Sequence, residues 1–210
     1  MCCLNDLFDG ETVDARVLVV RKGVRFFLKE GKDESDLLSE MDRFEWDDKY
    51  FETRWQKVLN KRARANVCFG IRSSEPDYER KKGRVVGFDW VKCLEMVKIG
   101  LKEKLGDKCA DLVCEGNRYF DLKKCRIGFH GVGERRKVVA CRLGSDMDLH
   151  FNWFIRSKIV GKKLELTLES GDMYFMSEKA IGTDWKRRNV YTLHHGAGSK
   201  GCKYLQFKRS

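Results

Sequence analysis

Six short apolar segments in the second half of the chain constrain the fold more than any other feature of the sequence. They are rich in β-branched and aromatic residues and cover residues 127–129, 138–143, 149–154, 164–168, 173–176 and 190–194. Glycine-containing breaks border these segments at residues 131–133, 144, 161, 171 and 196–198. Short strands at regular intervals, separated by turn residues, are typical of a β-sandwich or a barrel-like jelly roll. We therefore expect the second half of the chain to form a jelly roll.

The first half shows other patterns. Residues 12–29 alternate apolar and polar side chains around Lys22-Gly23, which predicts a β-hairpin. Residues 30–43 predict a loop that leads into a short helix. The aromatic residues that follow recur at roughly helical spacing, which we interpret as core packing rather than base stacking: Trp46, Tyr50, Phe51 and Trp55.

The clearest helix is predicted over residues 89–105, where apolar residues follow the helical period. Asp89 is its expected N-cap and Gly106 its expected stop. The fold class is thus α+β, a double-stranded β-helix (jelly roll) with N-terminal helices and a hairpin packed against it. We expect an N-terminal extension over residues 1–58 and the jelly-roll domain over residues 59–210.

The charge of the chain favours an anionic partner. The 210 residues include 43 Lys and Arg against 32 Asp and Glu, a net charge of +11. Nucleic acid is the partner that such a charge most directly predicts, and an inert basic surface is the alternative. Cations interleaved with an aromatic residue predict the contact surface, which comprises Lys61, Arg62, Arg64, Tyr78, Arg80, Lys81, Lys82 and Arg84.

The nine cysteines include no C-x-x-C pair, and no secretory signal precedes them, so we expect mostly buried, reduced thiols. No apolar stretch is long enough to span a bilayer. These features predict an intracellular protein, in the cytoplasm or nucleus, without membrane association. They do not indicate an oligomeric state.

The segment from Asn117 to Glu134 reads N-R-Y-F-D-L-K-K-C-R-I-G-F-H-G-V-G-E. It places an Asn-x-Tyr pair upstream of a lone histidine, His130, which an apolar strand-like stretch approaches. An amide and a phenol are suited to hold a small dicarboxylate, and an imidazole is suited to bind a metal. The segment resembles the iron- and 2-oxoglutarate-dependent dioxygenases of the AlkB family.

The resemblance spans roughly residues 60–209 and continues in order beyond this segment. It includes V-V-A-C-R-L-G at 138–144, L-E-S-G-D-M-Y-F-M-S at 168–177 and R-N-V-Y-T-L-H at 188–194. It implies that Asn117, Tyr119 and Arg188 bind 2-oxoglutarate. It also places His194 where the family has a second arginine and so implies that His194 belongs to the same 2-oxoglutarate-binding set.

The metal ligands depart from the family pattern. The resemblance makes His130 the first ligand, but Val132 occupies the position of the family's carboxylate, and a hydrocarbon cannot ligate. Glu134 is a nearby substitute. A set of His130, Asp184 and His195 would keep two histidines and one carboxylate around Fe(II) while exchanging their places. The lone histidine His150 is interpreted as structural.

The resemblance implies an Fe(II)- and 2-oxoglutarate-dependent dioxygenase that demethylates alkylated bases of DNA or RNA, after each base leaves its stack. The missing carboxylate favours an alternative, a catalytically impaired module that binds nucleic acid without oxygenase chemistry. A third hypothesis is an oxygenase that acts on a protein side chain or a small molecule.

Overall fold

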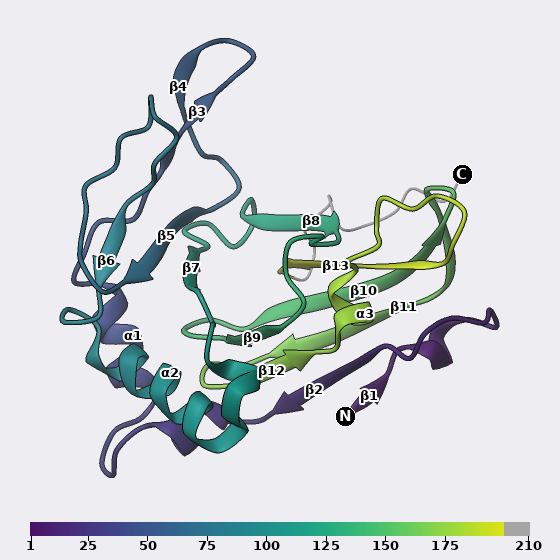
Figure 1. Ribbon diagram of the computed structural model, residues 1–210, viewed down its shortest axis with the longest axis horizontal. Helices are drawn as coiled ribbons and strands as arrows, with labels where there is room; N and C mark the ends of the chain where they lie inside the picture. The colour runs from purple at the N-terminus through teal and green to yellow at the C-terminus, as the bar shows by residue number, and fades with distance from the viewer. Residues whose placement is uncertain (200–210) are drawn as a thin grey trace. The chain divides into compact units, whose positions relative to one another are not determined.

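The computed structural model describes residues 1–199, which fall into two compact units (Figure 1). The first unit combines residues 1–23 with residues 126–199, and the second comprises residues 24–125. The boundary expected between residues 58 and 59 falls within the second unit. The N-terminal residues 1–23 join the second half of the chain through contacts that are distant in sequence, so no local pattern marks this boundary.

The first unit is built on two four-stranded antiparallel sheets (Figure 1). The sheet that we call the β12 sheet has the order β1-β2-β12-β9, with β1 at Cys2–Cys3, β2 at Arg16–Val20, β12 at Met173–Met176 and β9 at Val138–Cys141. The β10 sheet has the order β11-β10-β13-β8, with β11 at Lys158–Leu168, β10 at Met147–Ile155, β13 at Thr192–Gly198 and β8 at Arg126–His130. The helices of this unit are η1 at Asn5–Leu7 and α3 at Glu178–Ile181.

The core of the first unit draws on both sheets. On β10, the buried side chains of Phe151 and Trp153 join one apolar cluster with Val17 of β2 and Met176 of β12. The indole N–H of Trp153 donates a hydrogen bond to the carbonyl of Leu4 at 2.7 Å, so this buried polar group is satisfied. We call the face of the β10 sheet that carries Phe151 and Trp153 its inner face. Because side chains alternate along a strand, the neighbouring residues of β10 lie on its outer face.

All six strands predicted in the second half of the chain are present as β8 to β13. Two of the predicted breaks are wrong, because Gly161 lies within β11, which begins at Lys158, and residues 196–198 lie within β13, which begins at Thr192. The architecture is α+β, mostly sheet with few helices. Across residues 1–199 the strands do not close into a barrel.

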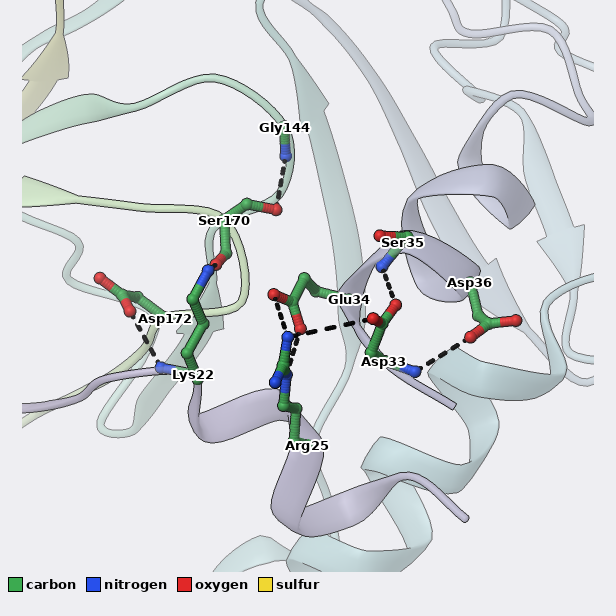
Figure 2. A network of polar contacts seen from close by, with 9 residues as sticks. All are labelled: Lys22, Arg25, Asp33, Glu34, Ser35, Asp36, Gly144, Ser170 and Asp172. Atoms are coloured by element: carbon green, nitrogen blue, oxygen red, sulfur yellow. Dashed lines mark hydrogen bonds and ion pairs between the residues drawn. The ribbon is translucent and has the colours of Figure 1, made fainter. Parts of the chain in front are cut away.

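The hairpin predicted over residues 12–29 is wrong in its second half. Residues Gly23–Phe27 form the 3₁₀ helix η2, while β2 pairs with β1 and β12 instead. The turn is held by long-range contacts, because Lys22 donates from its backbone N–H to Asp172 (3.0 Å) and from Nζ to the carbonyl of Ser170 (2.7 Å) (Figure 2). These partners lie far away in the sequence, so local alternation could not reveal them.

Asp172 belongs to the Gly-Asp pair that the AlkB resemblance includes, and it is fully buried. Burial alone would raise the pKa of its carboxyl group. Hydrogen bonds from the backbone of Glu169 and Lys22 and from the Arg21 guanidinium outweigh burial and lower that pKa. Asp172 therefore stabilises the turn before β12 as an ionised group.

The second unit contains two sheets and two longer helices. The hairpin of β3 (Lys49–Glu52) and β4 (Lys57–Asn60) is antiparallel. In the order β6-β5-β7, β5 (Ala65–Gly70) pairs with parallel β6 (Val85–Gly87) and antiparallel β7 (Cys114–Arg118). The helices are α1 at Glu34–Met41, α2 at Lys92–Leu105 and η3 at Gly106–Cys109.

The helical spacing expected for the aromatic residues 46–55 is wrong, and the core packing expected for them holds only for Trp46, whose ring packs against Phe44 at a centroid distance of 5.4 Å. Tyr50 and Phe51 lie on β3, and Trp55 lies in the hairpin turn with 61% of its surface exposed. Successive side chains of a two-stranded hairpin point to opposite faces, so this spacing does not bury them together.

Both predicted helices are confirmed. The helix α1 begins with a capping box, in which Asp33 accepts from the backbone N–H of Ser35 and Asp36 accepts from that of Asp33 (Figure 2). Arg25 pairs with the buried carboxylate of Glu34 through two contacts of 2.6 and 2.9 Å.

The cap of α2 differs from the expectation, and Asp89 as N-cap is wrong. The N-cap is Val91, which offers no side-chain hydrogen bond. The buried carboxylate of Glu40 instead accepts from the backbone N–H groups of Cys93 (2.8 Å) and Leu94 (3.3 Å). Gly106 ends the helix as predicted, with a φ of +67° that favours glycine.

The eight cysteines among residues 1–199 are free thiols, as expected. Three of them are buried and five are partly exposed, so the expectation of mostly buried thiols is wrong for this part of the chain. Cys202 lies outside the described residues. Within residues 1–199, no helix has both the length and the apolar character that a bilayer span requires.

Candidate functional site

The structure brings two of the predicted metal ligands together. His130 at the end of β8 lies directly opposite His195 of β13, and their ring centroids are 4.5 Å apart. His195 also lies opposite Phe151 of β10, with ring centroids 6.3 Å apart. Residues paired across strands share a face, so the two histidines lie on the inner face of the β10 sheet.

The two rings have different surroundings. His130 Nδ1 lies 2.8 Å from the carbonyl oxygen of Gly128, which only accepts, so Nδ1 carries a proton and Nε2 is the nitrogen that could bind a metal. Burial, followed by the charges of His130 and His194, lowers the pKa of His195 to about 3. His195 is therefore neutral at pH 7. Its buried Nδ1 has no hydrogen-bond partner among the described residues.

The position of the family's carboxylate is occupied by an apolar side chain. Val132 donates its backbone N–H to the carbonyl of Ile181 (3.1 Å), and its side chain packs against the core cluster. The backbone at Gly131, just after β8, lies close to the segment that follows α3. A Cβ at Gly131 would collide with the carbonyl of Gly182 and with Trp185. Glu134, the nearby alternative, is exposed in a turn.

Asp184, the third predicted ligand, already has a cationic partner. Its Oδ2 lies 2.6 Å from Lys179 Nζ, which also donates to the carbonyl of Tyr191. Across residues 1–199, no group of three His, Cys, Asp or Glu side chains is close enough to hold a metal ion. The described residues supply a histidine pair and do not fit a complete two-histidine, one-carboxylate site for iron.

Arg188 and His194, predicted to bind 2-oxoglutarate, line one pocket together. Its volume is about 340 Å³, and it is lined by Phe154, Arg156, Ser157, Trp185, Lys186, Arg187, Arg188, Thr192 and His194. His194 lies opposite Asn152 on β10, so it occupies the outer face, opposite to His195. The strand β13 thus separates the pocket from the histidine pair.

His194 is held as a neutral aromatic wall of this pocket. Its ring stacks on Phe154 at a centroid distance of 4.1 Å and an angle of 19°, and Trp185 meets it edge-on at 6.0 Å. Its Nε2 lies 3.3 Å from the hydroxyl of Thr192. Burial and the charge of His130 lower the pKa of His194 to about 4, against an opposing effect of Asp184.

The outer face also carries buried polar side chains. His150 is 4% exposed and lies 3.6 Å from Glu165, and burial lowers its pKa. Within residues 1–199 no other histidine pairs with it as His195 pairs with His130. Its side chain is buried between Glu165 and the ring of Phe129, which fits the structural role expected for it.

Asn117 and Tyr119 lie in the second unit. Asn117 is an exposed residue of β7, and its side-chain oxygen accepts a hydrogen bond from Arg64 Nε at 2.6 Å. Tyr119 follows the end of β7 and is partly buried.

Three of the residues predicted to contact nucleic acid surround the buried carboxylate of Asp47 instead. Tyr78 donates its hydroxyl to Asp47 at 2.9 Å, and the Arg84 backbone N–H donates to the same carboxylate at 2.5 Å. Lys61 donates to the carbonyl of Asp47 and to Asn66. Burial raises the pKa of Tyr78 to about 12, and burial lowers the pKa of Lys61.

Four of the other five predicted contacts are exposed on the second unit: Arg62, Lys81, Lys82 and, beside Asp77, Arg80. The fifth, Arg64, is partly buried and donates to Asn117. The four exposed cations are the most accessible part of the predicted basic segment.

The sequence reasoning missed most of the pocket. Among its lining residues only Arg188 and His194 were predicted, while Phe154, Arg156, Trp185, Lys186 and Arg187 were not. The run W-K-R-R at residues 185–188 was a usable signal, because it sets an aromatic ring beside three successive cations.

No protein-family model matches the chain. The chain is 45% identical over 184 residues to a protein of Acanthamoeba polyphaga mimivirus named "Uncharacterized protein R156", and the match covers 88% of this chain and 70% of the viral protein. The match extends across most of both units described above. The chain therefore belongs to the same family as this mimivirus protein.

Proposed function

We propose that the chain is an AlkB-like module that binds nucleic acid without oxygenase chemistry of its own. The His130–His195 pair carries this proposal: two imidazole rings lie side by side with centroids 4.5 Å apart, and Val132 occupies the position where the AlkB resemblance would place a metal-binding carboxylate. The net charge of +11 supports an anionic partner.

The proposed fold is a jelly roll of the AlkB type. Two four-stranded antiparallel sheets that share one apolar core support it, as does the position of the two histidines on neighbouring strands of the β10 sheet. Asp184 offers no simple replacement for the missing ligand, because Lys179 neutralises it. To act as a metal ligand, Asp184 would have to give up this partly buried ion pair.

An Fe(II)- and 2-oxoglutarate-dependent dioxygenase that demethylates nucleic-acid bases is the second candidate. The histidine pair favours it, since two of the three ligands of such a site are present. It predicts succinate release from 2-oxoglutarate by the wild-type chain when iron is supplied. Our primary proposal predicts none.

The substitution Val132→Asp tests the proposal. We expect the wild-type chain to bind Mn(II), used as an oxygen-stable probe for Fe(II), much more weakly than the variant. Loss of outer-shell contacts alone weakens metal sites by about 10–100-fold, so a restored direct ligand should gain at least that factor. Isothermal titration calorimetry measures both affinities.

Val132→Asn is the matched control, because it has nearly the size of Asp without the negative charge. The double variant V132D/H195Q should lose the gained affinity if His195 is a ligand. Equal Mn(II) affinity of the wild type and V132D, with both chains folded by circular dichroism, would contradict the assignment of the histidine pair.

A further inference from the structure

The pocket on the outer face of the β10 sheet combines positive charge with aromatic surface. Its volume of about 340 Å³ falls in the range of roughly 300–1,000 Å³ that is typical of small-molecule sites. Its residues come from the end of β10, from the β10–β11 turn, from the segment between α3 and β13, and from β13 itself. It is separate from the histidine pair, which lies on the inner face of the same sheet.

Four cations line this pocket without a carboxylate to neutralise them. Arg156, Lys186, Arg187 and Arg188 are exposed, and within residues 1–199 none of them forms an ion pair. The acid nearest to them in sequence, Asp184, is paired with Lys179. Unpaired guanidinium groups gathered at one cavity are suited to bind phosphate through paired N–H donors.

The opposite wall is aromatic. The rings of Phe154 and His194 are stacked at a centroid distance of 4.1 Å, and Trp185 stands edge-on to His194 at 6.0 Å. The ammonium of Lys186 lies 5.6 Å from the centroid of the Trp185 ring, so a cation adjoins the aromatic surface directly. A planar aromatic ligand with an attached anionic group matches both walls.

The turn that presents Arg156 is strained. Arg156 and Ser157 both have positive φ values, +49° and +64°, in the two-residue connection between β10 and β11. Such a turn strongly prefers Asn-Gly, because side chains with a Cβ are disfavoured in the left-handed region. The backbone N–H of Arg156 donates to the carbonyl of Arg188 at 2.9 Å and joins the two cationic segments. Strain of this kind gathers at binding sites.

We propose that this pocket binds a nucleoside phosphate, with the base against the wall of Phe154, Trp185 and His194 and the phosphate on the arginines. The ligand is either a free nucleotide or a phosphorylated nucleotide within a nucleic-acid strand. The inference deepens the proposed function, since it assigns nucleic-acid contact to this pocket, and it does not depend on metal binding.

The test measures binding of three probes to the full chain by calorimetry and fluorescence anisotropy: a set of nucleoside 5′-monophosphates, inorganic phosphate, and a 5′-phosphorylated single-stranded oligonucleotide. We expect mononucleotides to bind and inorganic phosphate to bind at least about tenfold more weakly, because it lacks the base. Inorganic phosphate that binds as tightly as a mononucleotide would overturn the assignment of a nucleoside.

Two variants locate the site. The double variant R187Q/R188Q should weaken mononucleotide binding about tenfold or more through lost charged hydrogen bonds. The double variant R156N/S157G keeps the turn with its preferred residues, so it should weaken binding while the midpoint of thermal unfolding stays unchanged or rises. The control K102Q/K104Q removes the same charge from exposed positions of α2 and should bind mononucleotides like the wild type.

The outcomes separate this inference from the proposed function. Oligonucleotide binding that R187Q/R188Q leaves intact, with no mononucleotide binding, overturns the pocket and leaves the proposed function standing. Mononucleotide binding without oligonucleotide binding supports the pocket and overturns the nucleic-acid function. Absence of binding for all probes to the folded wild type overturns both.

Discussion

His195 is a neutral imidazole in surroundings that oppose its protonation, and this has a consequence for stability. Burial and the neighbouring histidines lower its pKa to about 3, from an ordinary value of 6.5. As the pH falls below 6.5, the unfolded chain takes up this proton before the folded chain does. The stability is therefore complete above pH 6.5 and decreases as the pH falls towards the folded pKa.

We predict that this one residue lowers the free energy of unfolding by up to about 1.4 kcal/mol per pH unit between pH 6 and pH 4. Urea unfolding of the wild type and of His195→Gln across this range measures it. Carboxylates contribute equally to both chains, so the difference between their pH slopes isolates His195. Parallel slopes would show that His195 is not buried as a neutral group.

At the same scale, the sequence identified His130, His195, Arg188 and His194 and could not assign them to faces. Adjacent residues of β13 point to opposite sides of the β10 sheet, so His194 belongs to the pocket and His195 to the histidine pair. Only the cross-strand register fixes which side each one occupies. The partners of Asp184 and Tyr78, which are Lys179 and Asp47, could not be predicted from the sequence either, because only the folded chain brings them into contact.

At the scale of elements, the strands of the second half followed from their apolar segments, but glycine was an unreliable sign of a break, because Gly161 lies within β11 and Gly196 within β13. The helix α2 followed from its apolar period. The turn at Lys22, which leads from β2 into η2, and the cap of α2 did not, since both depend on carboxylates elsewhere in the chain, Asp172 and Glu40. Local patterns predict an element where its own residues stabilise it.

The cap of α2 yields a prediction at this scale. Glu40→Ala should lower the free energy of unfolding by about 1–3 kcal/mol, because it leaves buried N–H groups of the first turn without an acceptor. Glu40→Gln keeps one acceptor oxygen and should cost less. Chemical denaturation measures both changes.

Asp89→Ala provides the contrast. Asp89 is exposed and does not cap the helix, so its replacement should change the free energy of unfolding by no more than about 0.5 kcal/mol. A larger loss for Asp89→Ala than for Glu40→Ala would show that the helix begins as the sequence alone suggested.

At the scale of the whole molecule, composition predicted an anionic partner, and the folded chain distributes the cations in two ways. Lys61 and Arg84 donate hydrogen bonds to the buried residue Asp47 of the second unit. The cations of the pocket and the exposed residues Arg62, Lys81 and Lys82 remain available to a partner. Net charge alone does not distinguish these groups, because ion pairing is a property of the fold.

The most direct test of a nucleic-acid-binding module is the affinity of the wild-type chain for a single-stranded oligonucleotide as a function of salt concentration. We predict a linear fall of log K with log salt concentration, with a slope of about −0.7 for each phosphate that the chain neutralises. Fluorescence anisotropy from low to physiological salt, without added metal or 2-oxoglutarate, measures this slope. Affinity that is absent at low salt, or that does not change with salt, would contradict the account.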